Sequence, residues 1–490
     1  MASAVYEICA DWDNNGDFVD AFDNITADVK SVSYSRGKSN ELGTAEVGSC
    51  IITLNNATGK YTPSNSLGDL YGKLLPKRPI RVRATYDGNT YNLFYGYIEE
   101  IIPHPHLSEQ DCVITAVDGV DFLSRHDLST ALYKDAVSGT IHGYILNDAG
   151  WPVAMRTLDT GQLTVPYWYG GDVKARCAQE ELDDSEQGFS YIGGNGYFNF
   201  EDRYHRSTAT HQTSQATFNN TMVNITYSLN PRNVYNIIKV TVTPWAIQSL
   251  TTLWTLEETP AISPGETLTW WGEASVSGDS VFVDAWTTPV ITTDYTANSA
   301  VGGGGDDESA NISIVTTKFA KTIKLAITNN ALHIVYITKL QARGTYYDAQ
   351  TKVTRKKEDA TSQTAYQKRT LEIDGKYMTS ADLAQSYCDY AIGKFKDPRA
   401  ELSMTINNQD LATLTQILSR EISDRITVVN TKLGIDGDYF IDYMEHNISE
   451  GGLFHTATYR LADTVNEDFW CLDYSALASS SDSGQTKLGY

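Results

Sequence analysis

The sequence predicts a mainly β protein of several domains, with a smaller α+β part. The chain has 490 residues, enough for three or four domains at about 100 to 200 residues each. Its 30 tyrosines and nine tryptophans favour strands with large aromatic faces. Short segments of alternating apolar and polar residues recur along the chain between turns rich in Gly, Asn, Asp and Pro, which is the pattern of antiparallel sheets.

Charge and cysteine content exclude some classes of partner and of metal site. The 38 basic and 61 acidic residues give a net charge of −23, which disfavours nucleic acid or an anionic membrane as the main partner, because both bind Lys and Arg patches. The six scattered cysteines form no CxxC pair, so we expect reduced core thiols without a zinc site or disulfide framework. We also expect no signal peptide and no membrane span, because the sequence lacks a basic n-region and a long apolar run.

The first two predicted domains differ in their periodicity. In residues 1–128, the segments "SCIITLNN", "RPIRVRATY", "YNLFYGYIEEI" and "DCVITAVDG" read as strands. Asp87 and Gly88 between two of them give a hairpin signal. In residues 129–245, "TIHGYILNDAGWP" and "DVKARCAQEELDDSEQGFSYI" have helical spacing. The sequence therefore predicts a first β domain and an α+β middle domain.

Residues 246–345 are predicted to be an inserted β-sandwich, because strand-turn-strand series bracket a glycine-rich stretch. Five of the nine tryptophans lie at positions 245 to 286. Exposed indole rings stack on sugars and form interface hot spots, whereas buried ones would fill a sandwich core. Both interpretations stay open for the candidate contact residues Trp254, Trp270, Trp271 and Trp286.

The last part of the chain returns to strands. Residues 346–474 are predicted to form a second β domain with one helix, "TSADLAQSYCDYAIGKFKDP", capped by Thr379 or Ser380. Residues 475–490 are small and polar, and we expect a flexible or docked C-terminal tail.

An internal repeat links the two β domains. The segment "RPIRVRATYDGNTYNLFYGYIEEIIPH", continuing to "DCVITAVDGVD", matches the order of "DRITVVNTKLGIDGDYFIDYMEHNIS", continuing to "GGLFHTATYRLAD". Each has an Arg-led strand, an acidic-Gly hairpin, an aromatic strand and a final strand. Any two β-meanders share some of these features. The stronger interpretation is two copies of one β-barrel module, near residues 30–125 and 355–465, which would allow three chains to present six similar units.

Several segments are specific as a set. They are "ITLNNATGKYTPSNSLGDLYGKLLPKRPIRV" in the first module, "VPYWYGG" and "GYFNFEDRYHR" in the middle, and "YAIGKFKDPRAELSMTIN", "GIDGDYFIDYMEHNI", "HTATYRLAD" and "TKLGY" at the end. With these segments the chain resembles the tail-tip (baseplate) hub proteins of long-tailed, siphovirus-type bacteriophages. The resemblance covers residues 1–245 and 346–490, and leaves the role of the insertion open.

This resemblance implies a structural, non-enzymatic virion protein. It implies two tail-tube-like β-barrel modules per chain, and a homotrimer that closes the distal end of the tail. The implied partners are the tail tube or distal tail protein above, a tip or fibre protein below, the tape measure protein, and DNA in transit during ejection. An acidic lumen would let DNA slide without sticking. Assembly would occur in the host cytoplasm.

The stretch "DWDNNGDFVD" offers a candidate calcium site. Asp11, Asp13, Asn15 and Asp17 have the spacing of the first half of a calcium loop. The twelfth position is Phe22, which cannot ligate a metal. The same residue types also suit a tight turn, because Asp and Asn tolerate positive φ and bond their own backbone. We therefore predict either a hairpin turn or a loop that holds Ca²⁺, and no other cofactor.

Signals for enzymes are weak. His104 and His106 in "PHPH" lack a third ligand, so a loop is the simpler interpretation. No GxSxG, HExxH or P-loop motif is present, and Cys177 is expected to be a buried thiol in an amphipathic helix. Two rival functions remain: an adhesin that binds host surface glycan through the insertion, and a tail-associated glycan or cell-wall hydrolase.

Overall fold

The computed structural model describes residues 3–39, 42–106, 109–229 and 231–464, together with the backbone of two short strands, Phe469–Trp470 and Lys487–Leu488. Strands make up 47% of the structure and helices 17%, which confirms the predicted mainly β fold. Most of the predicted tail 475–490, and Cys471, lie outside the described residues. None of the described helices combines the length and the apolar content needed to cross a membrane.

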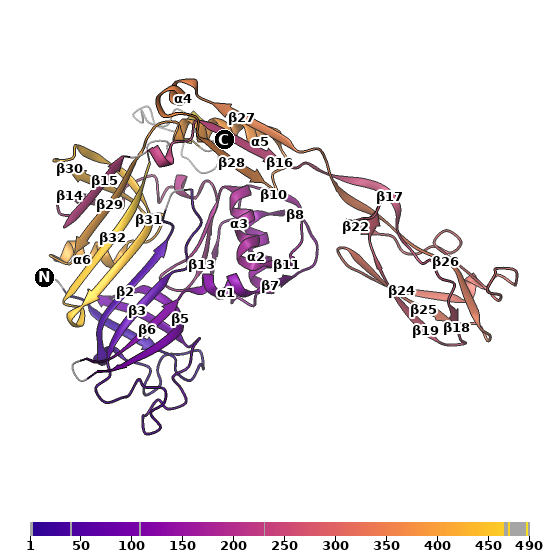
Figure 1. The fold of residues 1–490 in the computed structure, drawn as a ribbon, viewed down its shortest axis with the longest axis horizontal. Helices are drawn as coiled ribbons and strands as arrows, with labels where there is room; N and C mark the ends of the chain where they lie inside the picture. The colour runs from indigo at the N-terminus through magenta and orange to yellow at the C-terminus, as the bar shows by residue number, and fades with distance from the viewer. Residues whose placement is uncertain are drawn as a thin grey trace.

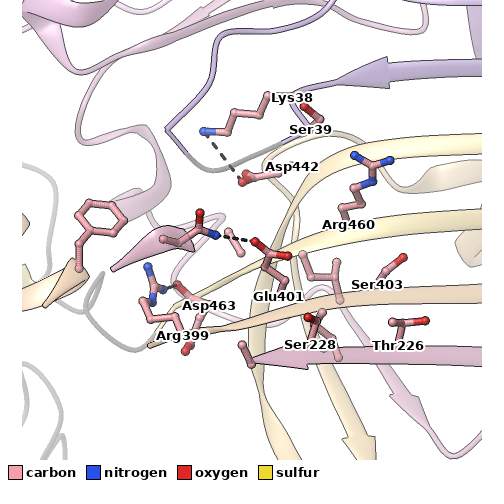
Figure 2. A pocket seen from close by; sticks show the side chains of 16 residues that line it. Lys38, Ser39, Thr226, Ser228, Arg399, Glu401, Ser403, Asp442, Arg460 and Asp463 are labelled. Carbon is pink, nitrogen blue, oxygen red and sulfur yellow. Dashed lines mark hydrogen bonds and ion pairs between the residues drawn. The ribbon is translucent and has the colours of Figure 1, made fainter. Parts of the chain in front are cut away.

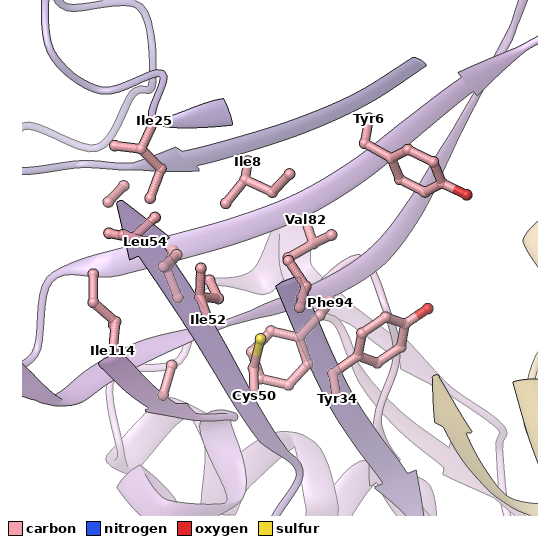
Figure 3. Packing of buried hydrophobic residues seen from close by; sticks show 14 of the residues in the cluster. Tyr6, Ile8, Ile25, Tyr34, Cys50, Ile52, Leu54, Val82, Phe94 and Ile114 are labelled. Carbon is pink, nitrogen blue, oxygen red and sulfur yellow. The ribbon is translucent and has the colours of Figure 1, made fainter. Parts of the chain in front are cut away.

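The first module consists of six strands that lie in the order β1-β4-β5-β6-β3-β2. These are β1 (Val5–Ala10), β2 (Val29–Gly37), β3 (Ser49–Asn55), β4 (Pro79–Tyr86), β5 (Asn89–Pro105) and β6 (Gln110–Val117). Alternate residues of each strand face one core, as Cys50, Ile52 and Leu54 do on β3 (Figure 3). The predicted turn between β4 and β5 is present, and both Asp87 and Gly88 have positive φ.

The second module repeats this strand order as β14-β30-β31-β32-β29-β15. Its strands are β14 (Ala216–Asn219), β15 (Asn224–Leu229), β29 (Ala400–Asn407), β30 (Arg425–Asn430), β31 (Ile435–Ser449) and β32 (Phe454–Asp463). The two related modules that the sequence repeat predicts are therefore confirmed. They join into one 12-stranded sheet through β2 and β31, and no sheet of the described chain closes into a barrel.

Two predicted boundaries differ from the structure. The range 129–245 was predicted as one α+β domain, but β14 and β15 within it pair with β30 and β29 of the second module. The range 346–474 was predicted as one β domain. Its first part instead forms a separate layer. In both cases a strand finds its partner far away in sequence, which local periodicity does not reveal.

The middle segment packs three helices against small sheets (Figure 1). The helices are α1 (Gly119–Arg125), α2 (Ser138–Asp148) and α3 (Ala175–Glu186). The strands are β7 (Asp127–Ser129), β8 (Tyr133–Val137), β9 (Arg156–Leu158), β10 (Thr164–Trp168), β11 (Gly171–Lys174), β12 (Phe189–Ile192) and β13 (Phe198–Glu201). Both predicted helical patterns thus lie in helices.

A further layer consists of a three-stranded sheet and one long helix. The strands β16 (Ile237–Val242), β27 (Val353–Glu358) and β28 (Thr370–Gly375) pair in the order β27-β16-β28. Helix α5 (Ala381–Phe395) packs on this sheet, and its cap is Ser380, whose side chain accepts a hydrogen bond from the Leu383 N–H. The shorter helix α4 (Ala360–Tyr366) is tied to the end of α5 by a hydrogen bond from Ser362 to the Lys396 carbonyl, and α6 (Leu411–Ser419) lies beside β29.

The insertion is a two-sheet sandwich that projects from the body (Figure 1). One sheet contains β17 (Trp245–Thr255), β18 (Ala261–Ile262), β22 (Phe282–Trp286), β23 (Tyr295–Asn298) and β26 (Val335–Ala349). The other contains β19 (Thr267–Glu273), β24 (Ile312–Lys318) and β25 (Thr322–Asn329). One apolar core fills the space between them. The predicted inserted sandwich is therefore present.

Candidate functional site

The most distinctive contact of the molecule is the pairing of β2 with β31, which we call the module junction. The register runs from Ser31 opposite Ser449 to Gly37 opposite Tyr443. Gly37 has a φ of +106°, and a Cβ there would lie 2.2 Å from the Asp442 carbonyl oxygen. The close approach of the two backbones therefore requires glycine at this end of the junction.

A buried polar chain crosses the module junction. The Tyr6 hydroxyl lies 2.8 Å from Nδ1 of His455, and Nε2 of His455 lies 2.9 Å from Nδ1 of His446. The ring of Tyr34 stacks on His446 with 4.7 Å between centroids. Burial lowers the pKa of His455 to about 3 and the pKa of His446 well below its ordinary value. Both rings are therefore neutral at physiological pH, and they link four strands of the two modules.

Charged side chains close the end of the junction. Arg36 lies 2.6 Å from Glu421, and its guanidinium also donates to the sulfur of Met444. Arg206 of the middle segment lies 2.7 Å from Asp442 of β31. Because partners come from both modules and from the middle segment, these ion pairs fix the three parts relative to one another. Removing one partner would leave a largely buried charge without its counter-ion.

A shallow cavity of about 270 Å³ lies beside this end of the sheet (Figure 2). Its walls carry groups of both charges, and hydrogen bonds hold two of them in place: Arg399 donates to the Asp463 carbonyl at 2.8 Å, and Asn233 donates to Glu401 at 2.6 Å. Lys38 lies 4.0 Å from Asp442. These contacts tie β29 and β32 to their neighbours.

The candidate calcium ligands form a hydrogen-bonded turn. Asp11 is buried, and its two carboxylate oxygens accept the N–H groups of Asn15 and Gly16 at 3.1 and 2.9 Å. Asp13 pairs with Lys73 at 2.8 Å. The structure does not bring Asp11, Asp13, Asn15 and Asp17 together around one point. The turn chemistry of the stretch is therefore visible, and calcium binding there stays a prediction.

A different acidic group forms next to this turn. Ligand oxygens of Asp17, Asp20 and Asp23 lie within 4.8 Å of one another. Burial raises the pKa of the Asp23 carboxyl, and the nearby carboxylates Asp20 and Asp11 raise it further. Asp23 also accepts the N–H groups of Trp12 and Asp20. The sequence pattern suggested Asp17 but missed Asp20 and Asp23, because they lie outside the spacing of a calcium loop.

The remaining histidines and cysteines have structural surroundings. His104 lies 2.8 Å from Asp111 and stacks on His106. Among the described residues, the acidic trio above is the one group with metal-site spacing, so these histidines have no third ligand. The prediction for Cys177 was wrong: its thiol is exposed, because it lies on the face of α3 that points away from the core. Four other cysteines are buried, as predicted: Cys9, Cys50, Cys112 and Cys388.

The four candidate tryptophans of the insertion divide by exposure. Trp286 is buried in the sandwich core and donates to the Phe319 carbonyl at 2.9 Å. Trp254 and Trp270 are half-buried against the same core. Trp271 is 59% exposed and stacks on Phe319. The core interpretation thus fits Trp286, and Trp271 is the most exposed of the four.

An aromatic cluster connects the insertion to the body. Tyr167 of β10 contacts Trp245, Phe282 and Tyr347, with ring centroids 4.6 to 5.2 Å apart. Lys134 of β8 forms an ion pair with Asp284 at 2.6 Å. The two connecting strands, β17 and β26, therefore also contact the middle segment, and these contacts orient the insertion.

Comparison with known proteins supports the fold. No protein-family model and no curated protein sequence matches the chain. Among solved structures, the tail protein from Neisseria meningitidis MC58 aligns over 95% of this chain and 98% of its own length, with 9% identity and a TM-score of 0.51. The 43 kDa tail protein of prophage MuSo2 from Shewanella oneidensis aligns over 94% and 98%, with 10% identity and a TM-score of 0.49. The chain therefore has a tail-protein fold, as its resemblance to tail hubs predicts.

Proposed function

We propose that this chain is a structural protein of a phage tail and forms the hub at the distal end of the tail tube. The observation that carries the proposal is the continuous sheet made of two modules with one strand order. The fold shared with the Neisseria meningitidis tail protein supports it. In a homotrimer, three chains would present six similar modules. A hub with threefold symmetry could then dock onto a tube with sixfold symmetry.

The mechanism of such a hub is mechanical. The modules of the trimer would continue the tube. The insertion, which projects from the body (Figure 1), would extend outward and serve as a platform for tip or fibre proteins. The channel would hold the tape measure protein and pass DNA, and the net charge of −23 suits a lumen that repels DNA. No catalytic step is needed for this role.

Immunogold electron microscopy tests the proposal. An antibody against residues 246–345 is applied to particles from the source lysate, both intact and mildly disrupted. We expect gold at the distal tail end, and a reconstruction of that end with threefold symmetry. Absence of the protein from purified particles would overturn the tail function and favour a free binding protein.

A second candidate function rests on the exposed aromatic face of the insertion. Trp271 stacks on Phe319, which is 45% exposed, and Lys324 lies 5.7 Å from the Trp271 ring. An exposed indole beside a cation can stack on a sugar ring and contact its polar groups. Binding of the full chain to host surface glycan, lost in Trp271→Ala and kept in Val315→Ala, would support the adhesin. Release of sugars from cell-wall material would instead favour the hydrolase.

A further inference from the structure

Four strands of the two modules, β5-β6-β3-β2 and β31-β32-β29-β15, correspond residue by residue near one β-bulge. Both hairpins carry a β-bulge at the same place, between Ile98 and Glu100 on β5 and between Ile441 and Tyr443 on β31. Counting along the registers from these bulges gives matching partner series: Ile98, Ala116, Cys50 and Tyr34 in the first module, and Ile441, Leu461, Leu402 and Tyr227 in the second. Strand β15 is therefore the second module's copy of β2, with Tyr227 in the place of Tyr34.

The two equivalent strands differ in what covers them. Strand β2 pairs with β3 on one side and with β31 on the other, and Tyr34 and Arg36 are only 2% and 4% exposed. Strand β15 ends the sheet, and Tyr227 and Leu229 are 47% and 59% exposed. An uncovered edge with large apolar side chains is a site for strand addition.

A matching uncovered edge lies on the first module. Strand β31 pairs with β30 up to Phe440 and with β2 from Tyr443 onward. Its copy β5 pairs with β4 up to Tyr97, and along the rest of that edge the described chain provides no strand. Each strand of the module junction therefore has an unpaired counterpart. The copy of β2 is β15, at one end of the sheet, and the copy of the junction half of β31 is the second half of β5 in the first module.

The outward backbone groups of this β5 edge can be identified. The His106 N–H donates to the Glu109 carbonyl on the β6 side, so Ile101, Pro103 and Pro105 direct their backbone groups outward by alternation. Their three carbonyls can accept hydrogen bonds, but the two prolines have no N–H to donate. A strand added here would form fewer backbone bonds than β2 forms with β31, where the corresponding residues are Met444, His446 and Ile448.

We propose that β15 of one copy of this chain adds to the Ile101–Pro105 edge of β5 in a second copy, as an antiparallel strand. Transfer of the junction register places Tyr227 opposite Pro103, and Leu229 opposite Ile101. Tyr227 would cover Pro103 as Tyr34 covers His446, and Leu229 would meet an apolar partner. The partner is a second copy because the template for this contact is the chain's own junction. The inference deepens the proposed hub by naming the contact between its chains.

Disulfide trapping tests the register. The junction puts Ser35 opposite Glu445, so Ser228 should lie opposite Ile102 in a pair without mutual hydrogen bonds, where Cα atoms are about 4.5 Å apart and a disulfide can form. Full chains carrying Ser228→Cys and Ile102→Cys are oxidised in a Cys177→Ser background. We expect covalent links between different chains, at least tenfold more than with either single variant.

The matched control shifts the register by two residues. Ser228→Cys with Glu100→Cys places the thiols about 7 Å further apart along the strand, and Glu100 is exposed, so its thiol is accessible to the oxidant. We expect little linking in this variant. Equal linking in both pairs, or none in either, would overturn the proposed register.

An independent measurement is the association state, by mass photometry over a range of concentrations. Tyr227→Lys should raise the dissociation constant between copies at least tenfold, whereas Val315→Lys on β24, where the side chain is 69% exposed, should leave it unchanged. A trimer that Tyr227→Lys leaves intact would overturn this inference and leave the hub function standing. If the protein is a monomer and its β15 amides are protected from hydrogen exchange, another part of the same chain covers this edge and the inference is wrong. The immunogold test of tail localisation would be unaffected by that result.

Discussion

The two modules have the same strand order, but the chain reaches it by different routes. The first module lies within residues 5–117, whereas the second takes two strands from 216–229 and four from 400–463. The intervening residues hold the β16 layer and the insertion. Because the entropic cost of closing a loop rises slowly with its length, a sheet tolerates a long excursion at one connection. Burial of the alternating face, and not contiguity in sequence, decides which strands meet.

The modules also differ in how far their equivalent strands β2 and β15 are buried. We expect the largest effect of this difference on stability at the equivalent residues Tyr34 and Tyr227. Tyr34 is 2% exposed and stacked on His446, so Tyr34→Ala should lower the free energy of unfolding by about 3 to 5 kcal/mol. Tyr227→Ala should cost less than about 1 kcal/mol in a dilute monomer. Urea denaturation followed by circular dichroism measures both. Similar losses would break the comparison.

A second prediction concerns the backbone of the module junction. Gly37 and Gly72 both have positive φ, but a Cβ at Gly37 would collide with the backbone of Asp442, whereas one at Gly72 would meet nothing within 4 Å. Both alanine variants should lose about 1 kcal/mol or more from the positive φ alone. Gly37→Ala should lose about 2 kcal/mol beyond that, because the strands must move apart. Equal midpoints in urea would show that the junction is looser than described.

The loops that follow the first strand of each module allow a third test. Asp11 accepts two backbone N–H groups after β1, whereas Asn220 after β14 accepts bonds from Thr431 alone. Asp11→Ala should cost about 2 kcal/mol, and Asn220→Ala about 1 kcal/mol. Melting curves in calcium and in a chelator complete the test. A stabilisation by calcium that Asp11→Ala abolishes would favour the metal loop over the turn.

The smallest expected effect is the pH dependence of the junction. Because the folded-state pKa of His446 lies well below its ordinary value of 6.5, the unfolded chain binds more protons below pH 6.5, and stability falls as the pH falls. Relative to His446→Gln, the wild type should lose roughly 1 kcal/mol per pH unit between pH 6 and pH 4.

The quantity to measure is the difference in the free energy of unfolding between the wild type and the His446→Gln variant at each pH. Burial raises the pKa of Asp118 to about 7, and this carboxyl favours folding as the pH falls, which opposes the histidine effect. Asp118 is present in both proteins, so its contribution cancels. Parallel stability curves in urea from pH 6 to pH 4 would mean that His446 is not held neutral by the fold.

Much of the fold could be predicted, because its information is local. Alternation in "SCIITLNN", the Asp87-Gly88 turn and the Ser380 cap each act within a few residues, and the repeat of two hairpins is visible by comparison of segments. The position of β14 and β15 could not be predicted, because their partners lie about 200 residues away. Their alternation in "ATFNNTMVNITYSL" indicates strands but not which sheet they join.

The candidate sites were harder to predict for the same reason. The alternation of Met444, His446 and Ile448 indicates an inward-facing histidine, but its contact with Tyr34 depends on β2, which is far away in sequence. Its contact with His455 depends on the register between β31 and β32. The acidic spacing at Asp11 fits the hydrogen bonds that its carboxylate accepts from Asn15 and Gly16. It did not reveal that Asp17 would meet Asp20 and Asp23, because side-chain direction in a loop is set by its hydrogen bonds.

The way the insertion is attached has an evolutionary consequence. The register of β17 and β26 sets Trp245 directly opposite Ala349, so the chain leaves and re-enters the body at neighbouring points. A segment with adjacent ends can be exchanged for another of different length or fold without redirecting the strands that flank it. Selection can therefore change the surface that the insertion presents to a partner, while the sheet of the body remains constrained by its own packing and assembly.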